Sequence, residues 1–218
     1  MTLKDLQSHV ETQIKNIFAY DIFLDYESVQ LANQKVQDVL RRSCNRYIET
    51  QKTNDACFSV FNTCHYCIFI YFLSNIIYKR DKNGTNAEKL YYLNKVLNCV
   101  DIFYEIELPN LFYVEHPVGS IIGRAKKIGD YFFFHQGCTV GENFGSFPTI
   151  GKNVTMFADS KILGNSVIGD NVILSANSYV INETIPDNSI VFGQSPNLII
   201  KTYDEKYIKT KLQRFWNY

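Results

Sequence analysis

The feature that most constrains this chain is a six-residue repeat of apolar side chains in its second half. The repeat is interrupted once, by a ten-residue step, and then resumes with the same spacing. Its positions are Ile122, Ile128, Phe134, Val140, Ile150, Met156, Ile162, Ile168, Leu174 and Val180. A fixed hexad over this many repeats is typical of a parallel β-helix, in which each coil stacks on the next. We therefore predict a left-handed parallel β-helix from about residue 122 to about residue 180.

Two further regularities stay in phase with the hexad. Small or β-branched residues stand two positions before the apolar one, where a narrow interior would admit them: Cys138, Val154, Ser160, Ser166, Val172 and Ser178. Glycine often stands directly after it, at Gly123, Gly129, Gly141, Gly151 and Gly169. A β-sandwich would instead alternate with a period of two and place turns every 8–12 residues, so the pattern favours the β-helix.

The first half of the chain has a helical period. A stripe at three- and four-residue spacing comprises Leu3, Leu6, Val10, Ile14 and Ile17, and another helix is expected from residue 86 to 100. The expected fold class is α+β. It comprises a helical N-terminal domain of four or five helices over residues 1–108, a β-helix over 109–201 and a C-terminal tail over 202–218, which we expect to be helical.

Composition excludes several classes of partner. The formal net charge is zero, and no basic stretch interleaved with aromatic residues occurs, so nucleic acid is not an expected partner. The apolar run from Cys67 to Ile77 is about 11 residues, too short for the roughly 20 that span a bilayer. We read it as a buried helix and expect no membrane association. The N-terminus does not resemble a signal peptide, which favours the cytoplasm.

The six cysteines include one Cys64-x-x-Cys67 pair. A zinc site would need a second pair or well-spaced histidines, and a redox site would need a βαβ context. We therefore expect buried thiols and no metal.

The ten-residue step corresponds to a loop from Gly141 to Thr149 that leaves the coil. Loops ejected from a regular scaffold often form binding surfaces. Because the loop follows His135 closely in sequence, a functional role is favoured over a tolerated insertion.

From Val100 to Lys201 the chain resembles the serine acetyltransferase branch of the hexapeptide acyltransferases. The family pattern V-D-I-H-P followed by D-H-A-T-G is matched by residues 100–104 and 115–119, with the family's fifteen-residue separation between Asp101 and His116 retained. Q-x-V-T-L-G is matched by residues 136–141, A-K-I-L-G-N by 160–165, and the C-terminal G-x-P-A motif loosely by 193–197.

The resemblance implies that His116 is the general base for the acceptor hydroxyl and that Asp101 orients its imidazole. A positioned base of pKa near 7 accelerates such a reaction by about 10²–10⁴-fold. His135 is the rival base, because related acyltransferases often carry a histidine near that position. No covalent acyl-enzyme is implied.

The acceptor side departs from the family. An Arg-His pair before the loop proline holds the serine carboxylate in the family, whereas Ser146 and Phe147 precede Pro148 here, and the loop is about four residues shorter. Glu115 replaces the family's aspartate before the base, and Gln136 begins a family motif at the site. Because a buried, unpaired carboxylate is costly, we expect an acceptor without one, such as a sugar, a sugar nucleotide or an amino alcohol, with genuine serine O-acetylation as the alternative.

The donor side matches the family better. The resemblance implies acetyl-CoA as co-substrate, with the pantetheine arm along small residues and Lys201 as a point charge for CoA phosphates. The expected donor positions are Gly141, Ala158, Ser175, Ala176 and Lys201.

Family members are trimers, with sites between subunits, or dimers of trimers, and we expect one of these states. Two other functions remain open. One is a non-catalytic trimeric scaffold, and the other is a carbonic-anhydrase-like β-helix, which would need three metal-spaced histidines where this half offers only His116 and His135.

Overall fold

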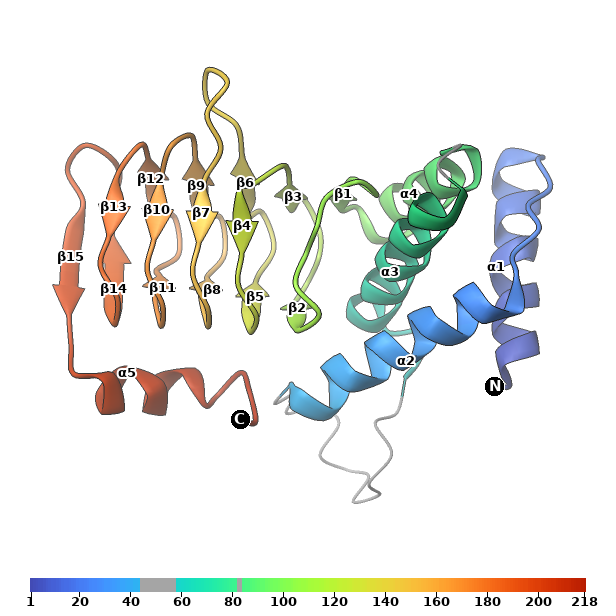
Figure 1. The fold of residues 1–218 in the computed structure, drawn as a ribbon, viewed down its shortest axis with the longest axis horizontal. Coiled ribbons are helices and arrows are strands. Elements are labelled where there is room, and N and C mark those ends of the chain that lie inside the picture. Colours follow the sequence, from blue (N-terminus) through green and yellow to red (C-terminus); the bar gives the residue numbers. More distant parts are fainter. Residues whose placement is uncertain (44–57, 82–83) are drawn as a thin grey trace.

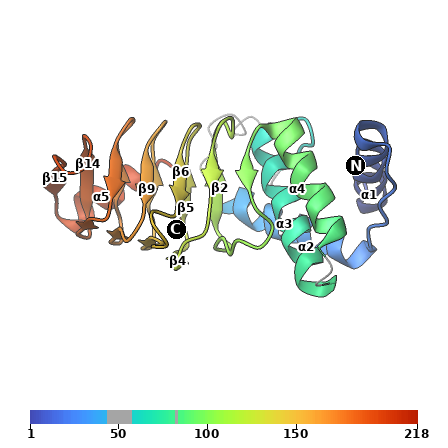
Figure 2. The same ribbon diagram turned by 90° about the horizontal axis from the view of Figure 1, so that it is seen from above.

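The computed structural model describes residues 1–43, 58–81 and 84–218. Figure 1 shows a helical N-terminal part at one end and a stack of flat coils at the other. The helices are α1 (Leu3–Phe18), α2 (Tyr26–Arg42), α3 (Thr63–Asp81), α4 (Thr85–Asn98) and, at the C-terminus, α5 (Glu205–Leu212). From above, the coils and the helical part form one elongated body (Figure 2).

The N-terminal helices form where the sequence places caps and apolar stripes. Thr2 and Asp5 form a capping box at the start of α1, and Asp25 caps α2. The central helix α3 contains the apolar run 67–77, all of it buried, which confirms the prediction of a core helix. Ile17 departs from the predicted stripe: it remains 40% exposed, because it lies in the last turn of α1, beyond the helices that cover the buried face.

The coils are built from short strands that form three sheets. The five-stranded sheet contains β1 (Asp101–Ile102), β3 (Ile121–Ile122), β6 (Thr139–Gly141), β9 (Lys161–Leu163) and β12 (Tyr179–Ile181). The four-stranded sheet contains β4 (Lys127–Ile128), β7 (Thr149–Ile150), β10 (Val167–Ile168) and β13 (Thr184–Ile185). The six-stranded sheet contains β2 (Phe112–Val114), β5 (Phe132–Phe134), β8 (Thr155–Met156), β11 (Ile173–Leu174), β14 (Ser189–Phe192) and β15 (Ile199–Thr202). Every pairing is parallel except β14 with β15, which is antiparallel.

The hexad positions line the interior, as predicted. All ten predicted apolar residues from Ile122 to Val180 are at most 9% exposed, and the small residues before them are buried. The in-phase glycines at the corner after the four-stranded sheet allow the coils to approach closely: a Cβ on Gly151 would lie 2.6 Å from the Gly169 carbonyl oxygen. The predicted fold, helices followed by a left-handed parallel β-helix, is confirmed.

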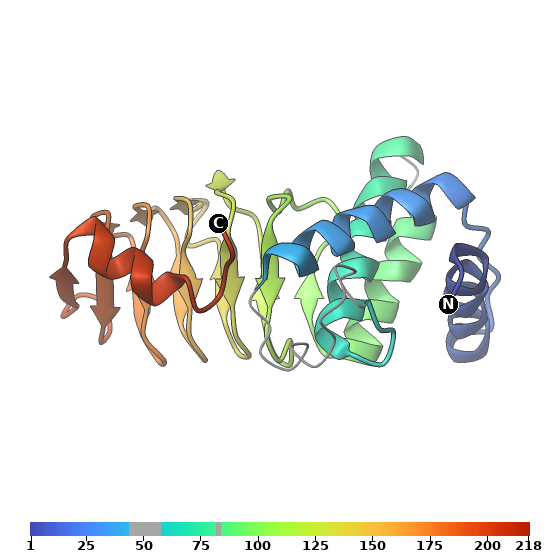
Figure 3. The ribbon, with the colours of Figure 1, turned by 90° about the horizontal axis from the view of Figure 1, so that it is seen from below.

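The C-terminal segment turns back along the outside of the six-stranded sheet (Figure 3). Ile208 and Leu212 of α5 pack on Ile173. The chain then reaches the helical part, where Trp216 is 1% exposed and forms a β-bridge with Ser43. One face of the β-helix is thereby covered by its own chain.

The described cysteines are Cys64, Cys67, Cys99 and Cys138, and all four are free thiols. Cys67 and Cys138 are buried and Cys64 is half-buried, but Cys99 is exposed, contrary to expectation, because it forms the left-handed C-cap of α4. Cys44 and Cys57 lie outside the described residues.

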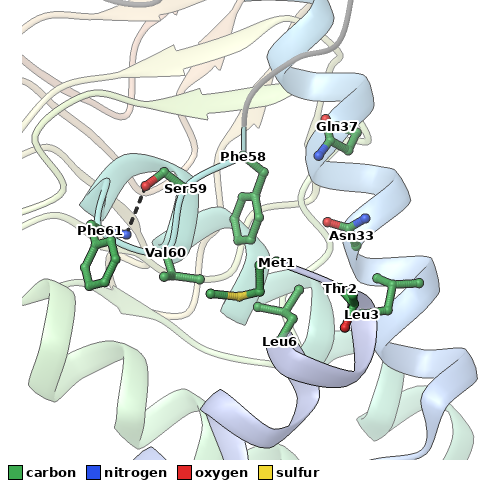
Figure 4. A pocket seen from close by; sticks show the side chains of 10 residues that line it. All are labelled: Met1, Thr2, Leu3, Leu6, Asn33, Gln37, Phe58, Ser59, Val60 and Phe61. Atoms are coloured by element: carbon green, nitrogen blue, oxygen red, sulfur yellow. Dashed lines mark hydrogen bonds between the residues drawn. The ribbon is translucent and has the colours of Figure 1, made fainter.

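Among the described residues, none of the helices combines the length and the apolar character that a bilayer crossing requires. A cavity of about 300 Å³ lies between α1, α2 and residues 58–61, with Leu6 and Phe58 in its wall and Asn33 and Gln37 along one side (Figure 4). It contains none of the predicted site residues.

Candidate functional site

Most of the predicted site residues meet at one corner of the β-helix. Here the chain passes from the six-stranded to the five-stranded sheet, and the strand register stacks successive coils on one another. We call this the first corner and define it as segments 115–120, 135–138, 157–160 and 175–178. It contains the predicted residues Glu115, His116, His135, Gln136, Ala158, Ser175 and Ala176.

His116 lies in the coil whose segment at the first corner is the longest. Six residues separate β2 from β3, whereas four separate β5 from β6. Register aligns Glu115 with His135, and the extra residues bulge outward around His116, which adopts a left-handed φ of 56° and is exposed. The Cys64 thiol at the start of α3 lies beside the backbone of His116, so the helical part contacts this bulge.

His135 lies one coil further on and is enclosed by aromatic rings. Its imidazole stacks on Phe157 with centroids 5.1 Å apart, and Phe133 and Phe215 complete the enclosure at 5.3 Å and 6.4 Å. Nε2 is buried without a hydrogen-bond partner among the described residues. Burial, with a smaller contribution from the nearby His116, lowers the pKa of His135 to about 4. The two candidate bases are therefore neighbours in different environments.

Gln136 follows His135 and also carries an unused polar atom. Its Oε1 is buried and lacks a partner among the described residues. A buried acceptor without a partner is costly, so the atom is free to bind a group that approaches the first corner. Small residues follow at this position in the next two coils, Ala158 and then Ala176, with Ser175 beside the latter.

Asp101 starts β1, at the edge of the five-stranded sheet. Its carboxylate accepts a hydrogen bond from the Tyr91 hydroxyl at 2.7 Å and pairs with Lys95 Nζ at 2.8 Å, both from α4. Across the described residues, no hydrogen bond joins Asp101 to His116. The backbones of the two segments are nonetheless connected, since Asp101 N donates to Ser120 O.

The remaining predicted residues lie elsewhere. Gly141 ends β6 on the far side of the five-stranded sheet, and Lys201 lies on β15, with its Nζ 5.6 Å from the centroid of Phe192. Because the register of β14 and β11 aligns Phe192 with Ser175, Lys201 lies at the end of the stack that carries the predicted donor residue Ser175.

The loop after β6 is a tight hairpin that projects from the coils (Figure 1). Asn143 and Ser146 exchange backbone hydrogen bonds across Phe144 and Gly145, which both have positive φ. Phe147 returns to the body of the β-helix, where the Arg124 guanidinium lies 5.9 Å from its ring centroid. Ser146 and Phe147 thus lie at a second corner, between the five- and four-stranded sheets.

Among the described residues, no group of three His, Cys, Asp or Glu side chains is arranged to hold a metal ion. The arrangement instead offers an exposed imidazole, a buried one and small residues in the adjacent coils, which suits proton transfer beside an extended ligand.

Comparison with known proteins shows which proteins this chain is similar to. No family model matches the sequence. A serine acetyltransferase from Synechococcus elongatus is 33% identical over 80 residues, which are 35% of this chain and 33% of the relative. One from Staphylococcus epidermidis is 30% identical over 104 residues, 46% of this chain and 48% of the relative. The chain thus matches a third to a half of the length of these curated relatives.

Solved structures extend the likeness to nearly the whole chain. The Entamoeba histolytica serine acetyltransferase isoform 3, in complex with cysteine, aligns over 96% of this chain and 76% of its own length, with a TM-score of 0.61 and 21% identity. A serine acetyltransferase in complex with CoA aligns over 92% and 86%, with a TM-score of 0.66 and 18% identity. The chain has the fold of the serine acetyltransferases. The resemblance predicted from the sequence is confirmed, and the structural likeness includes the helical part.

Sequence reasoning missed three features of the site. Lys95 and Tyr91 hold Asp101, Phe157 and Phe215 enclose His135, and Arg124 supports Phe147. The six-residue separation of Lys95 from Asp101 was a visible signal. No signal in the sequence indicated the contact of Phe215 with His135, since the two residues lie 80 positions apart.

Proposed function

We propose that this protein is an acetyl-CoA-dependent O-acetyltransferase whose acceptor is serine. The sequence similarity to serine acetyltransferases over 80–104 residues is the observation that carries the proposal. The likeness to structures determined with CoA and with cysteine, an amino acid of nearly the same shape as serine, supports both substrates.

In the proposed reaction His116 is the general base. It accepts the proton of the acceptor hydroxyl while the oxygen forms a bond to the thioester carbon, and it returns that proton to the CoA sulfur as the carbon–sulfur bond breaks. Its exposure at the first corner makes it accessible to an incoming alcohol. His135, with a pKa of about 4, is too weak a base to match it.

Asp101 is the proposed partner of His116. Because Lys95 and Tyr91 bind its carboxylate, they are expected to set how much of its charge reaches the imidazole. Ala158, Ser175 and Ala176 would admit the pantetheine arm at the first corner, with Gln136 Oε1 as an acceptor beside it, whereas Gly141 lies too far along the coil to contribute there.

The acceptor is the point on which sequence and comparisons differ. The replacement of the family's Arg-His pair by Ser146 and Phe147 favours an alcohol without a carboxylate, such as a sugar or an amino alcohol. The relatives favour serine. We adopt serine because the sequence likeness extends over 80–104 residues and the structural likeness over 92–96% of the chain, whereas the objection concerns two loop positions.

We also propose a homotrimer, or a dimer of trimers, located in the cytoplasm. Since α5 covers the six-stranded sheet, the other two sheets remain for subunit contacts. Ile121 is exposed on the five-stranded sheet and Val167 on the four-stranded sheet, and Val118 is exposed at the first corner beside Ile121. Sedimentation equilibrium measures this directly.

The proposed activity is tested by thiol release from acetyl-CoA with serine, 2-aminoethanol and a sugar nucleotide as acceptors. Serine-stimulated release supports the proposal, and preference for 2-aminoethanol or the sugar nucleotide supports the carboxylate-free alternative. Absence of release together with absence of acetyl-CoA binding in calorimetry would support the scaffold function instead.

A further inference from the structure

Arg124 is a guanidinium at the second corner without an acidic partner. It is exposed, and among the described residues it forms no ion pair and no hydrogen bond, whereas seven other pairs of opposite charge do lie within 4.0 Å of each other. Its guanidinium carbon lies over the ring of Phe147, 5.9 Å from the centroid. A guanidinium stacked on a ring keeps its N–H edge free to donate.

The other charged side chains near Arg124 already have partners, which leaves its guanidinium available to bind a ligand. A cavity of about 430 Å³ lies beside it, between the segment after β1 and the second corner, and is lined by Phe103, Glu105, Ile106, Glu107, Arg124, Ala125 and Lys126. Lys126 Nζ donates to Asn165 Oδ1 at 2.9 Å, and Glu107 pairs with Lys79 at 2.7 Å. Glu105 lies beside the Tyr78 hydroxyl and raises the pKa of that group. Of the two cationic side chains that line this cavity, Lys126 is already hydrogen-bonded, whereas the N–H groups of Arg124 have no acceptor among the described residues.

Phe147 connects Arg124 to the projecting loop. It stands at one of the two loop positions where the family resembled by the sequence carries the Arg-His pair. The ring is half-buried and offers a surface for the guanidinium. Arg124 itself comes from the preceding coil, two residues after the inward-pointing Ile122. The guanidinium of Arg124, which belongs to a coil and not to the loop, therefore lies at the base of the loop after β6.

We propose that Arg124, held against Phe147, binds the carboxylate of the acceptor, so that the acceptor is a hydroxy amino acid and not a simple alcohol. This rests on the proposed function in assuming that the second corner faces the acceptor in the assembled enzyme. A planar guanidinium binds a carboxylate through two parallel hydrogen bonds. Arg124 is thus a specificity-determining residue, and Phe147 is its positioning residue.

The test compares R124Q with a matched control, K126Q, which removes the same charge from the same cavity at a residue whose ammonium is already engaged. The acceptors are serine and 2-aminoethanol, which differ by the carboxylate. We expect R124Q to raise the KM for serine by roughly 10–100-fold, as for a lost charged hydrogen bond. It should leave the KM for acetyl-CoA and kcat/KM for 2-aminoethanol within about twofold, and K126Q should leave all three within that range. Phe147→Leu, which removes the ring face, should raise the KM for serine less than R124Q does.

Calorimetric titration of serine into wild-type protein and R124Q separates this inference from the proposed activity. Binding of serine that is lost in R124Q supports the inference even if no acetyl transfer occurs. Equal effects of R124Q on serine and 2-aminoethanol, an unchanged KM for serine, or wild-type protein that neither binds nor acetylates serine would each overturn it. In the last case, turnover of 2-aminoethanol would leave acetyl transfer intact.

Discussion

The imidazole of His135 lies parallel to the ring of Phe157, with an interplanar angle of 11° and centroids 5.1 Å apart. This stacking removes water from one face of the imidazole, and Phe133 and Phe215 approach from other directions. The charged form of His135 is therefore disfavoured, in agreement with a pKa of about 4. His116, with its side chain exposed, is not enclosed in this way.

The first prediction concerns which histidine is the base. We expect His116→Ala to lower kcat by about 10²–10⁴-fold, because it removes the group that accepts the proton. His135→Phe, which retains the ring stack, should lower kcat by less than about tenfold. Steady-state kinetics with serine and acetyl-CoA measure both. A larger loss in His135→Phe than in His116→Ala would reverse the assignment.

The second prediction concerns the C-terminal segment. Phe215→Ala opens the enclosure of His135 to water, so the pKa of His135 should rise from about 4 toward the 6.5 of an exposed imidazole. NMR titration of the imidazole C–H signals measures this, with Phe61→Ala as control, since Phe61 is 90% exposed. An unchanged pKa in Phe215→Ala would mean that Phe157 and Phe133 suffice to desolvate the ring.

The sequence predicts the β-helix well because its contacts recur. A position such as Ile162 repeats the environment of Val140 and Val180, so periodicity alone identifies inward side chains. The C-terminal segment has no such repeat: Trp216 is buried through contacts with Ser43 and Tyr131, which are remote in sequence. The pattern therefore could not reveal that one face of the β-helix is covered.

The site shows the same division. Family spacing selected His116 and Asp101, and the register places His116 at the first corner with three of the predicted donor residues, Ala158, Ser175 and Ala176. Spacing did not reveal that Asp101 is bound by Tyr91 and Lys95, because these come from a helix whose orientation depends on tertiary packing. Residues that repeat with the coils were predictable, whereas those contributed by other elements were not.

The third prediction is a loss of stability in acid through His65. This side chain is 1% exposed, and burial lowers its pKa to about 4 from 6.5. Since the unfolded chain binds the proton more tightly, His65 contributes its full stability above pH 6.5 and loses it as the pH falls from 6.5 to 4. The contribution is at most about 3 kcal/mol. Urea unfolding at pH 7.0 and 4.5 should show a smaller pH-dependent change for His65→Asn, which retains an acceptor for the Ser59 N–H. An equal change in both proteins would assign the acid sensitivity to other groups.

The fourth prediction concerns the closest approach of the coils, at Gly151. A Cβ there would lie 2.5 Å from Asp170 Oδ1 and 2.6 Å from the Gly169 carbonyl carbon and oxygen. The side chain of Asp170 can move, but the Gly169 backbone is fixed by its pairing in the stack, where Gly151 N donates to Ile168 O. Gly151→Ala should therefore lower the free energy of unfolding by about 1–3 kcal/mol, as overpacking does.

The chain provides a matched control for Gly151. Gly141 directly follows the inward-pointing Val140 on the five-stranded sheet, as Gly151 follows Ile150 on the four-stranded sheet. A Cβ on Gly141 would meet only Leu163 Cδ2, at 3.8 Å, which is ordinary van der Waals contact. Gly141→Ala should leave the free energy of unfolding unchanged or raise it by about 0.4–1 kcal/mol, because alanine restricts the unfolded chain. Urea unfolding with unchanged m-values measures both variants. The two positions differ strongly in the space available for a Cβ. If the two substitutions changed the free energy of unfolding equally, the glycines would therefore be explained by backbone conformation and not by the close spacing of the coils.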